Sequence, residues 1–166
     1  MTNIKEQEFN NIVGDILNNK KFKDLNKELH HGIARYEHSL RVAKMTYRFT
    51  SFFRMKNAEK TTRAALLHDF YTNEDLKDAS KTEKLSLHPS VACENAQKYY
   101  QLSPMEENII KSHMFPLKGE TPKYKESVVV SLMDKSVATY EMFRFKFSMV
   151  LTIWILFLFN IITIQK

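Results

Sequence analysis

Six side chains that can bind a metal ion or transfer a proton stand at inward-facing positions of this sequence. They are imidazoles and carboxylates: His38, His68, Asp69, His88, His113 and Asp134. Burying an unpaired carboxylate costs several kcal/mol unless it is paired, hydrogen-bonded or bound to a metal. The inward positions hold no equal number of cations, whereas a metal centre gives every one of these lone pairs a positive partner. The residue types therefore predict a metal site.

Two of the six stand side by side in the run AALLHDF, residues 64–70. Its first four letters are typical of buried helix, so His68 and Asp69 come at the end of an apolar turn. Any one inward histidine alone is more often a satisfied core residue than a ligand. The metal interpretation depends on all six residues converging.

Helices must bring these residues together, and the apolar spacing predicts them. In the helix over about 34–55, His38, Val42, Met45, Phe49 and Phe52 recur at alternating steps of four and three residues, which places His38 on the inward stripe. The expected helices cover about 2–17, 34–55, 58–70, from 88 onward, from 104 onward and 126–146.

Local signals set three of these boundaries. Residues 71–87 are polar and are expected to be partly loop, with Pro89 in the first turn of the helix that follows. Ser103 to Glu106 form a capping box with proline at the first helical position, and His113 lies inward on that helix. Along 126–146, Val130, Asp134, Val137 and Glu141 share one face. His30 and His31 stand beside a glycine and are interpreted as surface or rim residues.

Composition fits this helical picture. The chain has 166 residues with only 3 glycines and 4 prolines, which favours one all-α domain, a helical bundle. We place this domain at residues 1–146. The single cysteine, Cys93, excludes an intrachain disulfide and fits the cytoplasm.

The segment 147–164 differs from the rest because it carries no charge. Eighteen helical residues span about 27 Å, close to the thickness of the hydrocarbon layer. Arg144 and Lys146 come just before it and would stay on the cytoplasmic side. The segment is a candidate membrane anchor on the cytoplasmic face. The alternative is a helix that packs on the domain or on a second subunit, and a homodimer is left open.

The net charge of +6 suits a phosphorylated partner. Runs of Lys and Arg interleaved with aromatics are missing, so nucleic acid is not expected as the main partner. Arg41, Lys118 and Lys135 are candidate substrate-binding cations that would contact phosphate, with a solvated surface role as the alternative for each.

The chain resembles the HD-domain metal-dependent phosphohydrolases in the order of its candidate ligands, which is His38, then His68-Asp69, then Asp134. The segments around them are YEHSLRVA, AALLHDF and SLMDK. The resemblance covers about residues 30–142 and implies an all-α HD-domain bundle. It implies that His38, His68, Asp69 and Asp134 hold one metal, with His68 and Asp69 as the catalytic pair.

His88 in LHPSVA and His113 in KSHMFP resemble the extra histidines of the two-metal subset, which includes bacterial hydrolases of diadenosine tetraphosphate. The subset also includes HD-GYP cyclic-dinucleotide phosphodiesterases, but the GYP signature is missing here. The resemblance then implies that Asp69 bridges to a second metal held by His88 and His113. The ions would be divalent, iron or manganese, with zinc or nickel as alternatives.

The expected function is hydrolysis of a phosphate ester or anhydride of a nucleotide by a metal-activated water at this two-metal site. Small bacterial HD-domain proteins are the nearest resemblance. A mononuclear HD 5'-nucleotidase and a non-catalytic nucleotide-binding HD module are the alternatives. A structural bundle without a site would leave six inward polar residues unexplained.

Overall fold

The computed structural model describes residues 3–30 and 33–164, and it describes their side chains except at 3, 4, 30, 151 and 153–164. Within these residues the protein is all-α, apart from one pair of two-residue strands. The elements in chain order are α1 (Asn3–Asn18), α2 (Lys20–Asp24), the 3-10 turn η1 (Leu25–Lys27), β1 (Leu29–His30), β2 (Ile33–Ala34), α3 (Arg35–Phe52), α4 (Ala58–Leu67), the 3-10 turn η2 (Glu74–Leu76), α5 (Lys81–Gln97), α6 (Pro104–Ser112) and α7 (Lys125–Ile164).

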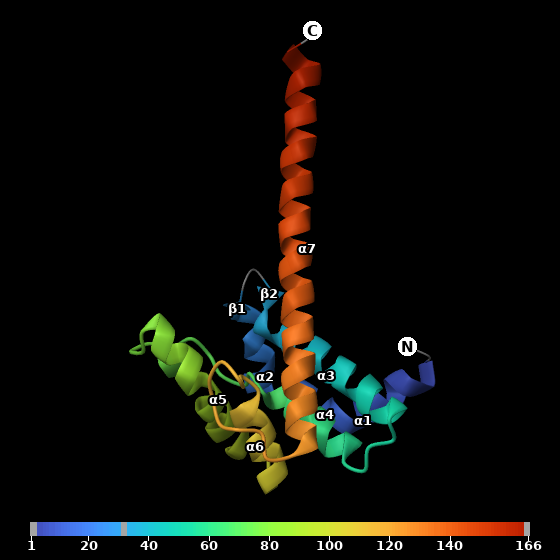
Figure 1. The fold of residues 1–166 in the computed structure, drawn as a ribbon, viewed down its shortest axis with the longest axis vertical. Coiled ribbons are helices and arrows are strands. Elements are labelled where there is room, and N and C mark those ends of the chain that lie inside the picture. Colours follow the sequence, from blue (N-terminus) through green and yellow to red (C-terminus); the bar gives the residue numbers. More distant parts are fainter. Residues whose placement is uncertain (1–2, 31–32, 165–166) are drawn as a thin grey trace.

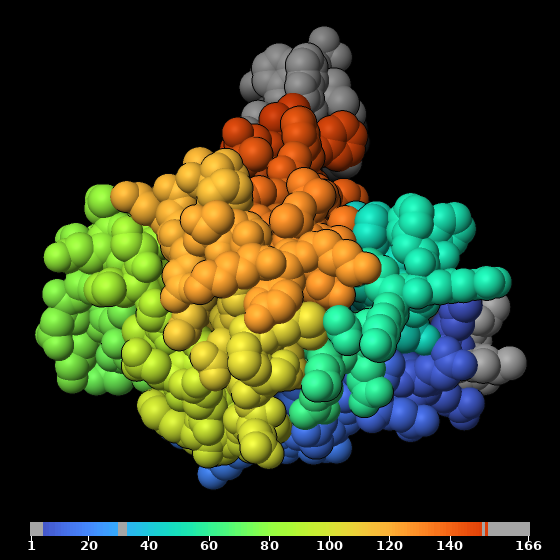
Figure 2. Space-filling model, turned by 60° about the horizontal axis from the view of Figure 1, so that its bottom comes forward, coloured from blue at the N-terminus to red at the C-terminus, as the bar shows by residue number. Residues whose placement is uncertain are grey.

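Helix α4 lies at the centre of the bundle. It contacts α1, α3, α5, α6 and α7, and its contact with α3 is the most extensive (Figure 1). The space-filling view shows α6 between α5 and the first turns of α7, and α6 contacts both (Figure 2). The core between the helices contains fully buried aliphatic and aromatic side chains, among them Phe9, Val13, Val42, Leu66, Ile109 and Val130.

Helix α4 explains where the His-Asp pair lies. Its residues Ala64 to Leu67 are all buried, so the helix is anchored on the core up to its last turn. The helix ends at Leu67, three residues before the predicted end at Phe70. His68 is the C-cap residue, and Asp69 follows in the turn. The pair is therefore held at the end of a buried helix.

Helix α5 begins earlier than the sequence analysis predicted. Ser80 accepts a hydrogen bond from the backbone N–H of Glu83, and Glu83 accepts one from the backbone N–H of Ser80. This capping box satisfies donors of the first turn and starts the helix at Lys81. Residues 71–80 lie outside the α-helices, which agrees with the expectation that 71–87 is partly loop. The predicted opening of the helix at His88 was wrong, and so was the placement of Pro89 in its first turn, because Pro89 lies inside the helix.

The start of α6, the strand pair and the two histidines beside Gly32 had different outcomes. Helix α6 has the predicted capping box of Ser103 and Glu106, with Pro104 at its start. The antiparallel pair β1–β2, which aligns Leu29 with Ala34, was not predicted. His31 and the side chain of His30 lie outside the described residues, so their interpretation as rim residues stays a prediction.

Helix α7 is continuous from Lys125 to Ile164, and its second half projects away from the bundle (Figure 1). The described side chains on its projecting part are exposed, among them Phe143, Phe145, Phe147, Met149 and Val150. Among the described residues, no helix is both long and apolar enough to cross a membrane. Most side chains of segment 147–164 lie outside the described residues. The anchor and the domain division at 146 stay predictions.

Candidate metal centre

The structure places all six predicted ligands close together inside the bundle. They come from five helices or helix ends, and each is at most 8 % exposed. His38 lies on α3, His68 and Asp69 follow α4, His88 lies on α5, His113 follows α6, and Asp134 lies on α7.

Asp69 stands in the middle of this cluster. Its Oδ2 lies 3.8 Å from Nε2 of His68. Its Oδ1 lies 3.5 Å from Nε2 of His88 and 3.7 Å from Nε2 of His113. The two carboxylate oxygens therefore face different histidines, which is the arrangement that a bridging carboxylate needs.

Asp134 is the second carboxylate around which the histidines gather. Its Oδ1 lies 3.0 Å from Nε2 of His38 and 3.6 Å from Nε2 of His68. Two sets of three residues each bring their ligand atoms within 4.8 Å of one another, and His68 belongs to both. One set is His38, His68 and Asp134, and the other is His68, Asp69 and His113.

Backbone carbonyls fix the orientation of three imidazoles. A carbonyl oxygen only accepts, so a ring nitrogen that contacts one must carry the proton. Nδ1 of His68 donates to the carbonyl of Ala65 at 2.8 Å. In the same way, Nδ1 of His88 donates to Lys84 at 3.0 Å, and Nδ1 of His113 donates to Ile110 at 2.7 Å. The Nε2 atoms therefore point into the cluster, which is how metal-binding histidines are usually oriented.

His38 is held differently, by a residue to which the sequence analysis gave no role. Its Nδ1 donates to Oε2 of Glu141 at 2.8 Å, and Oε1 of Glu141 accepts from Arg41 at 2.7 Å. Glu141 shares the inward face of α7 with Asp134, as the sequence analysis placed it. The signal that could have identified it is a second carboxylate on that face, two turns after the first.

The electrostatics of the cluster follow from burial and close charges. Burial alone would lower the pKa of His38, but hydrogen bonds to Asp134 and Glu141 outweigh it and raise the pKa to about 10. Burial would raise the pKa of Asp69, yet the nearby histidines, His68 first, hold it well below its usual value. Burial and the neighbouring His68 lower the pKa of His113 to about 3. His113 is therefore neutral near pH 7 and has a free lone pair.

Two buried polar atoms in the centre of the cluster have no hydrogen-bond partner among the described residues. They are Nε2 of His68 and Oδ1 of Asp69. In addition, Nε2 of His88 and Nε2 of His113 face one another at 3.0 Å, although Nδ1 carries the proton in both rings. A buried polar atom without a partner is unfavourable, and a cation among these atoms would satisfy them. The donor set therefore fits divalent metal ions.

The three predicted phosphate contacts lie in different surroundings. Arg41 is bound to Glu141. Nζ of Lys135 donates to the carbonyl of His113 and to Oγ of Ser131, both at 2.8 Å, and burial lowers its pKa. Lys118 is exposed in the loop after α6. Arg41 thus binds Glu141, and Lys135 binds the backbone of His113, so both are tied to residues of the cluster or next to it. Their contact with a substrate stays a prediction.

A buried arginine borders the cluster beside His88. Arg35 is 2 % exposed, donates to the backbone carbonyl of Tyr71 at 2.8 Å, and stacks over the ring of Tyr71 at 3.9 Å. That ring in turn packs on His88 at 5.2 Å between centroids. The sequence analysis missed Arg35, although it stands three residues before His38 on the same helix.

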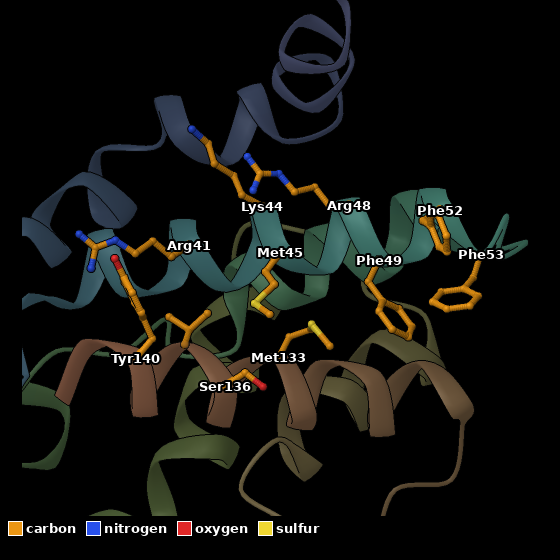
Figure 3. A pocket seen from close by; sticks show the side chains of 11 residues that line it. Arg41, Lys44, Met45, Arg48, Phe49, Phe52, Phe53, Met133, Ser136 and Tyr140 are labelled. Carbon is orange, nitrogen blue, oxygen red and sulfur yellow. The ribbon is translucent and has the colours of Figure 1, made fainter. Parts of the chain in front are cut away.

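A groove of about 820 Å³ runs between α3 and α7 next to the cluster. Its lining is mainly apolar, and Arg41 at one end connects it to Glu141. Figure 3 shows Met45, Phe49 and Met133 between the two helices, with Tyr140 near Arg41 and Phe52 and Phe53 at the other end.

Comparison with known proteins agrees with this geometry. The family model of the HD domain matches residues 35–139, which is more than half of the chain and includes all six residues of the cluster. Glu141 lies two residues beyond the match. Comparison with curated proteins and with solved structures gave no match. The extent of the family match, together with the His/Asp cluster, shows that this chain belongs to the HD-domain family.

Proposed function

We propose that this protein is a hydrolase that cleaves a phosphate ester or anhydride of a nucleotide at a two-metal site. HD domains bind divalent metals, and the family consists mostly of metal-dependent hydrolases. Beyond this family-level activity, we propose two metal ions and a nucleotide substrate.

The proposed ligand sets follow the groups of residues around Asp134 and Asp69. His38, His68, Asp69 and Asp134 would hold one ion. His88 and His113 would hold the other, with Asp69 shared between them. The opposite orientation of the two Asp69 oxygens supports this sharing. Mixed imidazole and carboxylate ligands suit iron or manganese, and zinc or nickel are the alternatives.

Bound divalent ions would polarise phosphoryl oxygens and lower the pKa of water, which turns it into a nucleophile at neutral pH. The chain's own residues would supply the setting. The four imidazoles are oriented by their Nδ1 hydrogen bonds. Burial of the whole cluster lowers the local dielectric constant and strengthens each charge interaction with the substrate.

The observation that carries the proposal is the pair of buried atoms without partners, Nε2 of His68 and Oδ1 of Asp69. A fold that needed these residues only for packing would leave each atom with a desolvation cost of about 1 to 3 kcal/mol. The net charge of +6 supports a phosphorylated substrate.

The test is the metal content of the purified chain, prepared without chelators and measured by elemental mass spectrometry. We expect about two metals per chain in the wild type and a clear loss in His68→Ala and His113→Ala. His30→Ala, a histidine outside the six, serves as the matched control and should bind like the wild type. A screen of nucleotide esters and anhydrides on the loaded protein then tests hydrolysis.

The other outcomes separate the alternatives. One metal that is indifferent to His113→Ala would favour a mononuclear nucleotidase. A correctly folded chain that binds no metal, even after iron or manganese is added, would rule out the catalytic proposal. Metal binding without turnover of any nucleotide would leave a binding module.

A further inference from the structure

His38 differs from the other three histidines of the cluster in the group that holds its ring. His68, His88 and His113 donate to uncharged carbonyls of their own helices. His38 donates to the carboxylate of Glu141, which lies 103 positions further along the chain. This contact depends on how α3 packs on α7, whereas the other three depend on local helix geometry.

Glu141 is itself fixed in place. It is 8 % exposed, and each of its oxygens has one partner, His38 at 2.8 Å and Arg41 at 2.7 Å. Arg41 follows His38 by three residues on α3, so one helix presents both the ring and the guanidinium to the same carboxylate. Hydrogen bonds between ionised groups are short and directional. The Glu141 side chain is therefore held in one orientation.

The two edges of the His38 ring face different carboxylates. Nε2 lies 3.0 Å from Asp134, inside the cluster, while Nδ1 faces Glu141 on the opposite edge. Because His38 and Arg41 occupy the two oxygens of Glu141, this carboxylate lies outside the set of ion-binding atoms. Its influence on an ion must pass through the His38 ring.

We propose that Glu141 is a positioning residue that holds His38 with its Nε2 lone pair directed at the metal, and that Arg41 holds Glu141 for this task. The proposal rests on the proposed function, because it requires His38 to bind an ion. A charged acceptor at Nδ1 also makes Nε2 a stronger electron donor. Arg41 accordingly serves the metal centre.

The chain offers a matched control on the same helix. Glu126 is 3 % exposed and accepts a hydrogen bond from Asn57 at 3.1 Å, and within the described part of the chain no metal-ligand candidate is among its hydrogen-bond partners. Glu126→Gln and Glu141→Gln are therefore the same chemical change at two buried positions of α7, and only one of them bears on His38.

The experiment titrates the full-length chain with Mn²⁺ and measures free Mn²⁺ by electron paramagnetic resonance. Glu141→Gln keeps an acceptor but loses the charge, and Glu141→Leu loses both. Loss of a group that orients a metal-binding histidine typically weakens binding by about 10- to 100-fold. We expect about tenfold for Glu141→Gln, more for Glu141→Leu, and no change for Glu126→Gln.

A second measurement on the metal-free chain does not depend on metal binding. Nitrogen-15 NMR of labelled histidines shows whether Nδ1 of His38 carries a proton. We expect this proton in the wild type and its loss in Glu141→Leu, with the other three rings of the cluster unchanged. An unaltered His38 signal together with wild-type Mn²⁺ affinity would overturn the proposal. If the wild type binds no Mn²⁺, the proposed function fails, and the NMR result alone decides whether Glu141 holds His38.

Discussion

The two ends of the metal-ligand cluster are built in different ways. At the α3–α7 end, His38 contacts Asp134 and Glu141, residues about a hundred positions away. At the α5–α6 end, His88 and His113 are oriented by carbonyls three or four residues away. One end depends on the packing of two distant helices, and the other on local helix geometry. Asp69 lies between the two ends. Its Oδ1 is next to His88 at the α5–α6 end, and its Oδ2 is next to His68, which lies between the ends as well.

The largest expected effect comes from the residue between the two ends. Asp69→Asn keeps the shape of the side chain but removes the charge that the proposal shares between both ions. We expect metal content to fall at both ends and the rate of hydrolysis to fall by about 1,000-fold or more, since one stabilising group is already worth about 100- to 1,000-fold. Elemental analysis and steady-state kinetics measure this. Retention of both metals would refute the bridging role.

His38 and His113, one at each end of the cluster, should respond to pH in opposite directions in the metal-free chain. His38 faces Asp134, Glu141 and Asp69, and its pKa in the folded state is about 10 against 6.5 for the free side chain. The folded state therefore binds this proton more tightly than the unfolded state does. The stability that His38 contributes is complete below pH 6.5 and is lost as the pH rises to about 10.

His113 has the opposite sign. Its folded-state pKa is lowered to about 3, so the unfolded state binds the proton more tightly, and stability is lost as the pH falls from 6.5 towards 3. The lowered pKa values of Asp69 and Asp134 add further loss below 3.8. Urea unfolding in the presence of a chelator should show the free energy of unfolding falling on both sides of neutrality. Glu141→Leu should flatten chiefly the alkaline side, because it removes an acceptor of His38. On the acid side it removes only the loss that comes from the lowered pKa of Glu141 itself. Equal flattening on both sides would contradict the distinction between the two ends.

Lys135 offers a smaller change that is confined to the α5–α6 end. Lys135→Met keeps the apolar stem but removes the donor to the carbonyl of His113. Because Ser131 still donates to that carbonyl, we expect a loss of stability of about 1 kcal/mol. Metal binding should weaken for one ion alone. Lys118→Met, in the exposed loop, is the control and should leave stability and metal content unchanged. Loss of both metals in Lys135→Met would show that the ends are not independent.

The smallest effect on the cluster should come from truncation after Lys146. Among the described side chains of α7, Glu141 is the last one that contacts the cluster, and those beyond it are exposed. The truncated chain should keep its metal content and its melting temperature. If segment 147–164 is an anchor, flotation with lipid vesicles should be lost at the same time. A loss of metal would show that the projecting half of α7 supports the α3–α7 end.

The sequence was informative about which residues face the interior and less so about which residues meet across helices. The inward positions of His38, His68, His113 and Asp134 followed from apolar spacing, because helical periodicity fixes which face a residue occupies. The start of α5 could also have been predicted, because Ser80 and Glu83 have the spacing of a capping box, but this signal was overlooked.

The pairing of Glu141 with His38 could not be derived from the sequence. Periodicity places each residue on the inner face of its own helix, but it does not set how far α7 slides along α3. That register results from packing of side chains across the core. The same holds for Arg35, whose stacking on Tyr71 joins the start of α3 to the turn after α4.

The most direct test of the two-metal centre is anomalous X-ray diffraction from crystals of the Mn²⁺-loaded protein, recorded at the manganese edge. Our account predicts two peaks on either side of the Asp69 carboxylate, one next to His38 and Asp134 and the other next to His88 and His113. A single peak at the α3–α7 end would contradict the second ion, and a fully loaded crystal with no peak in the cluster would contradict the metal centre itself.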